Sequence, residues 1–120
     1  MTAADSGVFD LTCELVDIAS ESFAEQVLVE RLESELRSLP HLTVTRVGDN
    51  VVARTDFGRA RRLVLGGHTD TVPANDNFPG RVDADVLWGV GSADMKGGLA
   101  LILMAARTFV DPPIDLTFVF

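Results

Sequence analysis

The chain is short of cysteine, and this excludes several kinds of protein. Its 120 residues contain one cysteine, Cys13, so no disulfide can form within it. A single thiol favours a reducing, cytoplasmic location. Cys13 lies off the predicted apolar stripe of its helix and has no paired base nearby, so we expect a small packing residue and not a catalytic thiol.

Long apolar runs and positive charge are also scarce. The longest apolar segment, "LALILMAA" at 99–106, is far below the ~20 residues of a membrane span. The first ten residues, "MTAADSGVFD", have neither the basic region nor the apolar core of a secretory signal. Ten Lys and Arg face 18 Asp and Glu, and the net charge of -8 argues against nucleic acid or an anionic membrane as a partner. A composition of 47% hydrophobic and 23% charged residues fits one modest soluble domain.

Two helices are predicted first. "FDLTCELVDIAS" has apolar residues at helical spacing, with a buried stripe at Leu11, Leu15 and Ile18. "SESFAEQVLVERLESELRSLP" predicts a second, longer helix that ends before Pro40. Ser22 and Glu25 have the S-x-x-E spacing of a capping box at its start.

The rest of the chain predicts an α/β fold. "LTVTRV" and "VVART" flank a "GDN" turn and predict a hairpin. "RLVLGG" is a continuous apolar run, typical of a strand that is buried on both faces. After a loop at 74–93, "DMKGGLALILMAARTF" predicts a buried helix and "IDLTFVF" a buried strand. Strand, helix and strand together predict a βαβ unit in a sheet covered by helices.

His68 and Asp70 follow the third predicted strand. In an extended backbone, residues i and i+2 point to the same side, so both side chains should leave the strand's carboxyl end together. Ligands bind at this edge of open α/β sheets. An imidazole is a good ligand for transition metals, and a neighbouring carboxylate can orient it. The alternative is a capping histidine and a turn aspartate without a metal.

Asp94 lies in the glycine-rich stretch "LWGVGSADMKGG" at the start of the buried helix. It could cap that helix, or it could be a second metal ligand at the same sheet edge as His68. A dinucleotide loop is excluded because the third glycine is absent and no clear strand leads into the motif. Lys96 lacks the surrounding sequence of a phosphate-binding loop.

"GGHTDTVP" followed by "LWGVGSADMKGG" resembles the paired signature of the aminoacylase/carboxypeptidase-type dinuclear zinc peptidase family. Upstream, "DIASES" with Glu25 is similar to an early family stretch, and downstream the likeness reaches "DLTFVF". It therefore covers the chain from about Asp10. Within the family, the sequence most resembles the bacterial succinyl-diaminopimelate desuccinylases. Acetylornithine deacetylases and di/tripeptidases share the same motifs.

This resemblance implies a role for each site residue. His68 would be a ligand to one metal ion, and Asp94 would bridge two divalent ions, zinc in the first place and cobalt as the alternative. Asp70 would be the catalytic carboxylate that orients and polarises the site. The Asp94–Met95 peptide bond would be cis. Ala19 stands where the family usually has proline, and Val90 stands where it often has arginine. The difference at Val90 bears on substrate contacts more than on metal binding.

The resemblance also implies an activity and a domain organisation. The parent enzyme would hydrolyse the amide of N-succinyl-LL-2,6-diaminopimelate, a small N-acyl amino acid, to succinate and LL-2,6-diaminopimelate in lysine biosynthesis. It would be a homodimer. Residues 1–120 would be the N-terminal portion of one α/β/α catalytic domain with a mixed, mostly buried sheet. The Glu-Glu pair, the later ligands and the lid/dimerisation domain would be missing, so we expect no appreciable activity from the chain alone.

Other readings of the sequence remain open. His41 is expected to be exposed and unable to replace a missing ligand. The same family motifs would also fit an acetylornithine deacetylase, an aminoacylase or a peptidase. From a different functional class, the chain could be a non-catalytic binding module that retains half of the fold.

Overall fold

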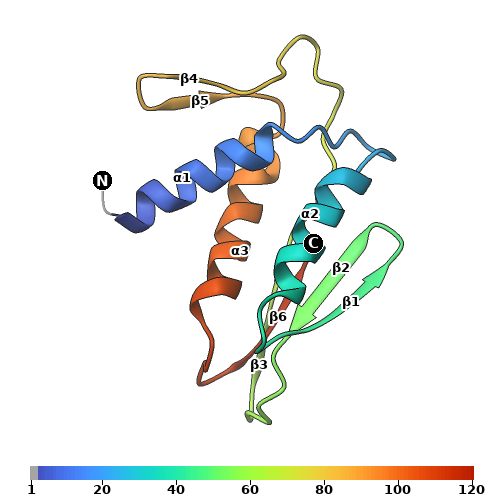
Figure 1. Ribbon diagram of the computed structural model, residues 1–120, viewed down its shortest axis with the longest axis vertical. Helices are drawn as coiled ribbons and strands as arrows, with labels where there is room; N and C mark the ends of the chain where they lie inside the picture. The colour runs from blue at the N-terminus through green and yellow to red at the C-terminus, as the bar shows by residue number, and fades with distance from the viewer. Residues whose placement is uncertain (1–2) are drawn as a thin grey trace.

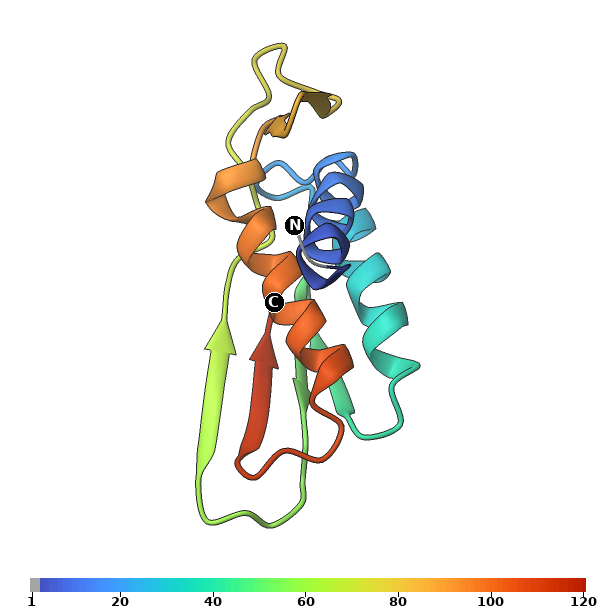
Figure 2. The same ribbon diagram turned by 90° about the vertical axis from the view of Figure 1, so that its left-hand side faces the viewer.

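The computed structural model of the chain describes residues 3–120, with side chains from residue 7 onward. Three helices lie on one face of a four-stranded sheet (Figures 1 and 2): α1 (Ala3–Val16), α2 (Gln26–Arg37) and α3 (Gly97–Thr108). The strand order is β1-β2-β6-β3, formed by β1 (Thr43–Val47), β2 (Asn50–Arg54), β6 (Asp115–Val119) and β3 (Arg62–Gly66). A separate two-stranded ribbon contains β4 (Arg81–Asp83) and β5 (Val86–Trp88). In this described part of the chain, no helix has both the length and the apolar character to cross a membrane.

The predicted hairpin and the predicted βαβ unit are both confirmed. β1 pairs antiparallel with β2, and β3 pairs parallel with β6, so the sheet is mixed. The connection from β3 to β6 contains the β4–β5 ribbon, a short helical turn η1 (Ser92–Lys96) and α3. This crossover brings the loop after β3 and the start of α3 to the same edge of the sheet.

The hydrophobic core lies between the helices and the face of the sheet that they cover. Alternate residues of two central strands are buried there, as period-2 geometry requires: Val51 and Ala53 on β2, Leu116 and Phe118 on β6. The helices contribute residues at helical spacing, which are Leu11 and Leu15 of α1, Leu28, Leu32 and Leu36 of α2, and Leu99, Leu103 and Ala106 of α3.

The prediction that the strand before His68 is buried on both faces is wrong. β3 lies at the edge of the described sheet, with β6 on one side, and the three helices cover only one face (Figure 2). Leu63 and Val64 are consequently 50% and 58% exposed. An apolar run predicts that a strand can be buried. It does not predict whether other parts of the described chain pack over that strand.

Three local predictions are also wrong. α1 ends at Val16, before Ile18, and α2 begins at Gln26. The N-cap of α2 is Glu25, which makes no side-chain capping bond, so Ser22 and Glu25 do not form a capping box. The β4–β5 ribbon occupies part of the segment that was expected to be a loop. Its strands of three residues are too short to show a periodic pattern.

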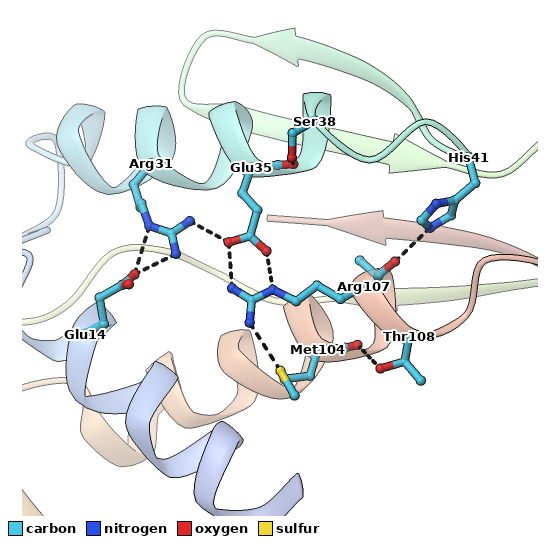
Figure 3. A network of polar contacts seen from close by, with 9 residues as sticks. Glu14, Arg31, Glu35, Ser38, His41, Met104, Arg107 and Thr108 are labelled. Carbon is cyan, nitrogen blue, oxygen red and sulfur yellow. Dashed lines mark hydrogen bonds and ion pairs between the residues drawn. The ribbon is translucent and has the colours of Figure 1, made fainter. Parts of the chain in front are cut away.

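Glu35 links the three helices through two arginines (Figure 3). Its Oε1 accepts hydrogen bonds from Arg31 Nη1 at 2.9 Å and from Arg107 Nη2 at 2.7 Å. Arg31 Nε also donates to Glu14 of α1 at 2.8 Å. Burial alone would raise the pKa of Glu35, but the hydrogen bonds from Arg107 and Arg31 outweigh it and lower the pKa. The carboxylate therefore joins α2 to α3 directly and to α1 through Arg31.

His41 is half-buried, contrary to the expectation that it is exposed. Its Nε2 lies 2.8 Å from the carbonyl oxygen of Ala106 at the end of α3 (Figure 3). A histidine side chain can be buried when a carbonyl oxygen accepts a hydrogen bond from one of its ring nitrogens. His41 thus has a structural partner.

Asp115, at the start of β6, is buried and holds the loop between β2 and β3. It accepts hydrogen bonds from Thr55 Oγ1 at 2.6 Å and from the backbone N–H groups of Phe57 at 2.9 Å and Arg59 at 2.8 Å. The Thr55 hydroxyl, the two backbone donors and the nearby Arg62 lower the pKa of Asp115 to about 2. The carboxylate is therefore charged in the folded chain and satisfied by its donors.

Candidate metal-binding site

The loop that follows β3 packs directly on the turn before α3. A Cβ on Gly67 would lie 2.7 Å from Met95 Cε, which is too close for any other residue without a shift of Met95. The backbone N–H of His68 points at Met95 Sδ, 3.3 Å away. The glycine before His68 therefore permits the close approach of the two segments that carry the predicted site residues.

The turn before α3 has an irregular backbone. Gly91 has φ of +78°, and Asp94 and Met95 have non-helical angles (φ -128°, ψ 88° and φ -138°, ψ 38°). The Asp94–Met95 peptide bond is cis, as the family resemblance implies. The N-cap of α3 is Lys96, without a side-chain capping bond, so Asp94 does not cap that helix. Its carboxylate is directed to His68 instead.

His68 lies between two carboxylates. Its Nε2 is 2.8 Å from Asp94 Oδ1, and its Nδ1 is 3.2 Å from Asp70 Oδ1 and 3.0 Å from the Asp70 carbonyl oxygen. The side chains of His68, Asp70 and Asp94 are 45%, 44% and 87% exposed. The hydrogen bond with Asp94, followed by the contacts with Asp70, raises the pKa of His68 above its usual value. The structure thus brings together all three residues that the sequence singled out.

The Asp70 carboxylate is fixed from its other side by Ser22. Ser22 Oγ donates to Asp70 Oδ2 at 2.7 Å. This hydrogen bond, and further the charge of His68, lowers the pKa of Asp70 below its usual value. Both oxygens of Asp70 therefore have partners, and the carboxylate is held in its ionised form.

His68 and Asp94 have the donor chemistry of a zinc site. Imidazole nitrogen and carboxylate oxygen are both ordinary zinc ligands, and here they lie 2.8 Å apart in the lining of a hollow of 180 Å³. Among the side chains that the structure describes, however, no three of His, Cys, Asp or Glu gather as a group that could hold a metal. The two donors fit a metal ion, and further ligands would have to complete its coordination.

Sequence reasoning missed two residues that support these loops. Ser22 was assigned to a capping box, and Lys96 was considered only as a phosphate ligand. Lys96 is 1% exposed, and its Nζ donates to the carbonyl oxygen of Ile18 at 2.5 Å. Burial lowers its pKa to about 8. The available signal was the position of Lys96, two residues after Asp94 and directly before a nearly all-apolar helix. A lysine in that position is a candidate for a buried hydrogen-bond donor.

One cavity lies beside the site residues, and another lies away from them. A cleft of 410 Å³ is lined by His68, Asp70 and Phe23, a residue that is 96% exposed and has φ of +70°. A larger groove of 540 Å³ between α1 and α3 is lined without any titratable side chain. Of these two, the smaller cleft is therefore the one with titratable groups that could orient a ligand.

Comparison with known proteins shows what the chain is similar to. Residues 64–120 match the model of peptidase family M20/M25/M40, and the matched segment contains His68, Asp70 and Asp94. A tripeptidase from Staphylococcus aureus superposes with a TM-score of 0.81 at 25% identity, over 96% of this chain and 35% of that one. Aminopeptidase PepT from Bacillus cereus has the same fold, with a TM-score of 0.78 over 95% of this chain and 35% of that one, at 20% identity.

The sequence relatives are more specific. The chain is 44% identical over 112 residues to a putative succinyl-diaminopimelate desuccinylase of Mycobacterium tuberculosis, which covers 92% of this chain and 32% of the relative. It is 47% identical over 100 residues to the succinyl-diaminopimelate desuccinylase of Corynebacterium glutamicum, with 82% of this chain and 27% of the relative covered. The chain thus spans about a third or less of the curated relatives that it matches, and the expected resemblance to desuccinylases is confirmed for that part.

Proposed function

We propose that the chain supplies one side of the metal site of an amide hydrolase. His68 would bind a metal ion through Nε2, and Asp94 would bind through its carboxylate and bridge two ions. The observation that carries this proposal is the 2.8 Å approach of His68 Nε2 to Asp94 Oδ1, with Asp70 behind the opposite ring nitrogen. Asp70 would accept a hydrogen bond from Nδ1–H, fix the ring and make Nε2 a stronger donor to the metal. Zinc is the ion that this donor pair suits, with cobalt as the alternative.

The proposed substrate is N-succinyl-LL-2,6-diaminopimelate, and the reaction would belong to lysine biosynthesis in the cytoplasm. Support comes from the 44% and 47% identity to desuccinylases. Water would add to the amide carbonyl, the C–N bond would break, and the proton would pass to the amine, which gives succinate and LL-2,6-diaminopimelate. Bound divalent ions would polarise the carbonyl and lower the pKa of water. An acetylornithine or other N-acyl amino acid substrate would use the same residues.

We further infer that residues 1–120 correspond to the N-terminal portion of a single catalytic domain, of a parent enzyme that is a homodimer. The described residues bring no third ligand to His68 and Asp94, and we assign none of them as the general base. The 120-residue chain alone should therefore show no turnover. Release of amine from the succinylated substrate by the purified chain with Zn²⁺, above a Zn²⁺-only control, would contradict this.

The test of the site is a zinc titration by calorimetry. The chain has two histidines, which makes His41→Gln a matched control for His68→Gln. We expect His68→Gln and Asp94→Asn to weaken Zn²⁺ binding at least 10-fold, while His41→Gln keeps the wild-type affinity. Equal affinities for all four proteins, or an equal loss in the His41 variant, would refute the assignment.

A further inference from the structure

The segment between α1 and α2, residues 17–25, is bonded to the loop that carries His68 and Asp70. Ser22 N donates to the carbonyl oxygen of Thr71 at 3.1 Å, and Thr71 N donates to the carbonyl oxygen of Ser20 at 2.9 Å. Ser20 Oγ donates to the carbonyl oxygen of Thr69 at 2.7 Å. These bonds on both sides of Asp70 fix the backbone of Ser22 beside that residue.

The Ser22 side chain completes a continuous chain of polar contacts. Its hydroxyl donates to Asp70 Oδ2 at 2.7 Å, and the other oxygen of the same carboxylate lies 3.2 Å from His68 Nδ1. The opposite ring nitrogen of His68 then meets Asp94 at 2.8 Å. Because Ser22 and His68 occupy different oxygens, the two contacts together define the rotation of the Asp70 carboxylate.

No other contact among the described residues accounts for the Ser22 hydroxyl. It does not cap α2, which begins four residues later at Gln26, and the residue is exposed. Its only other described acceptor is the Thr71 carbonyl oxygen at 3.4 Å, which is longer than the 2.7 Å bond to Asp70. A hydroxyl has one proton to donate, and the Ser22 hydroxyl donates it to Asp70.

We propose that Ser22 is a positioning residue that holds the Asp70 carboxylate in place and, through it, the orientation of His68. The consequence for metal binding rests on the function proposed above, whereas the effect on the imidazole ring does not. Without the hydroxyl, Asp70 Oδ2 loses its protein donor and the carboxylate turns more freely. The Nδ1 contact then weakens, and the ring is no longer held with Nε2 toward Asp94.

The experiment compares Ser22→Ala with Ser22→Thr, which keeps a hydroxyl. ¹⁵N spectra of the histidine rings are recorded at one fixed pH without metal, and His41 is the internal reference. In Ser22→Ala we expect the His68 ring nitrogens to shift, with no change at His41 and an unchanged melting temperature, since an exposed hydroxyl adds little stability. Ser22→Thr should resemble the wild type. With Zn²⁺ added, Ser22→Ala should bind about 10-fold more weakly, the lower end for partners of metal ligands.

Each outcome decides the matter. Unchanged His68 signals in Ser22→Ala, or equal shifts in Ser22→Ala and Ser22→Thr, would overturn the positioning role. Parallel shifts at His41 with a lowered melting temperature would show a general structural effect and overturn it as well. If the His68 signals move as expected but His68→Gln and Asp94→Asn bind Zn²⁺ as tightly as the wild type, the positioning role holds and the proposed function fails.

Discussion

Replacement of Gly91 by alanine should destabilise the chain through two separable effects. The residue has φ of +78°, and an alanine there costs about 1–2 kcal/mol relative to an ordinary backbone angle. Its Cβ would also lie 2.5 Å from Thr71 Cγ2, and such overpacking of a buried contact costs about 1–3 kcal/mol. The expected total is about 2–5 kcal/mol, a large share of the ~5–15 kcal/mol of a typical domain.

Gly58 provides the control for the backbone effect. It has φ of +70°, and a Cβ there would meet nothing within 4 Å. Gly58→Ala should therefore cost only the backbone part, about 1–2 kcal/mol. The free energy of unfolding, measured by urea titration, gives the packing part as the difference between Gly91→Ala and Gly58→Ala.

Thr71→Ser tests the cause of the packing part. The substitution removes the methyl group that meets the new Cβ and keeps the hydroxyl, at a cost of about 1 kcal/mol by itself. In a double-mutant cycle, Gly91→Ala and Thr71→Ser should show a favourable coupling of about 1–3 kcal/mol. A Gly91→Ala cost no larger than that of Gly58→Ala, or a coupling near zero, would refute the reasoning.

Three further predictions concern other parts of the chain. Asp115 has a folded-state pKa of about 2, below the ordinary value of about 4. Its contribution to stability is therefore present above pH ~4 and is lost as the pH falls toward 2. In Asp115→Asn, the free energy of unfolding measured over that interval should change less with pH than in the wild type. Ala84 has φ of 55° in the turn between β4 and β5, and Ala84→Gly should stabilise the ribbon by about 1 kcal/mol, seen as slower hydrogen exchange there; unchanged exchange would contradict the strain. Glu35→Gln removes the charge that Arg31 and Arg107 share, and should cost about 1.5–3 kcal/mol in urea unfolding, a loss that an equally stable variant would disprove.

Much of the architecture could be predicted because its signals are local. The β1–β2 hairpin shows alternation around a turn, and α3 and β6 are apolar segments separated by "DPP". The juxtaposition of His68 and Asp94 followed from topology, because the crossover of a βαβ unit returns to the same sheet edge.

The errors arose where a distant partner decides the outcome. Ser22 has the right sequence spacing for a capping box, but its hydroxyl meets Asp70, 48 residues away along the chain. Leu63 and Val64 have the composition of a buried strand, but their exposure depends on what lies over β3. His41 gains its acceptor from Ala106 at the end of a helix formed 65 residues later. None of these contacts can be predicted from the residues next to Ser22, Leu63 or His41 in the sequence.

One short segment outside the named helices and strands supports both loops of the site. The loop after β3 is bonded to Ser20 and Ser22, and the turn that carries Asp94 is anchored by Lys96 to the carbonyl oxygen of Ile18. Both loops are therefore hydrogen-bonded to residues 17–25, so this connector helps to fix their relative position. Since donors to one ion must be placed within fractions of an ångström, the separation of His68 and Asp94 should respond to changes in this connector that touch neither residue.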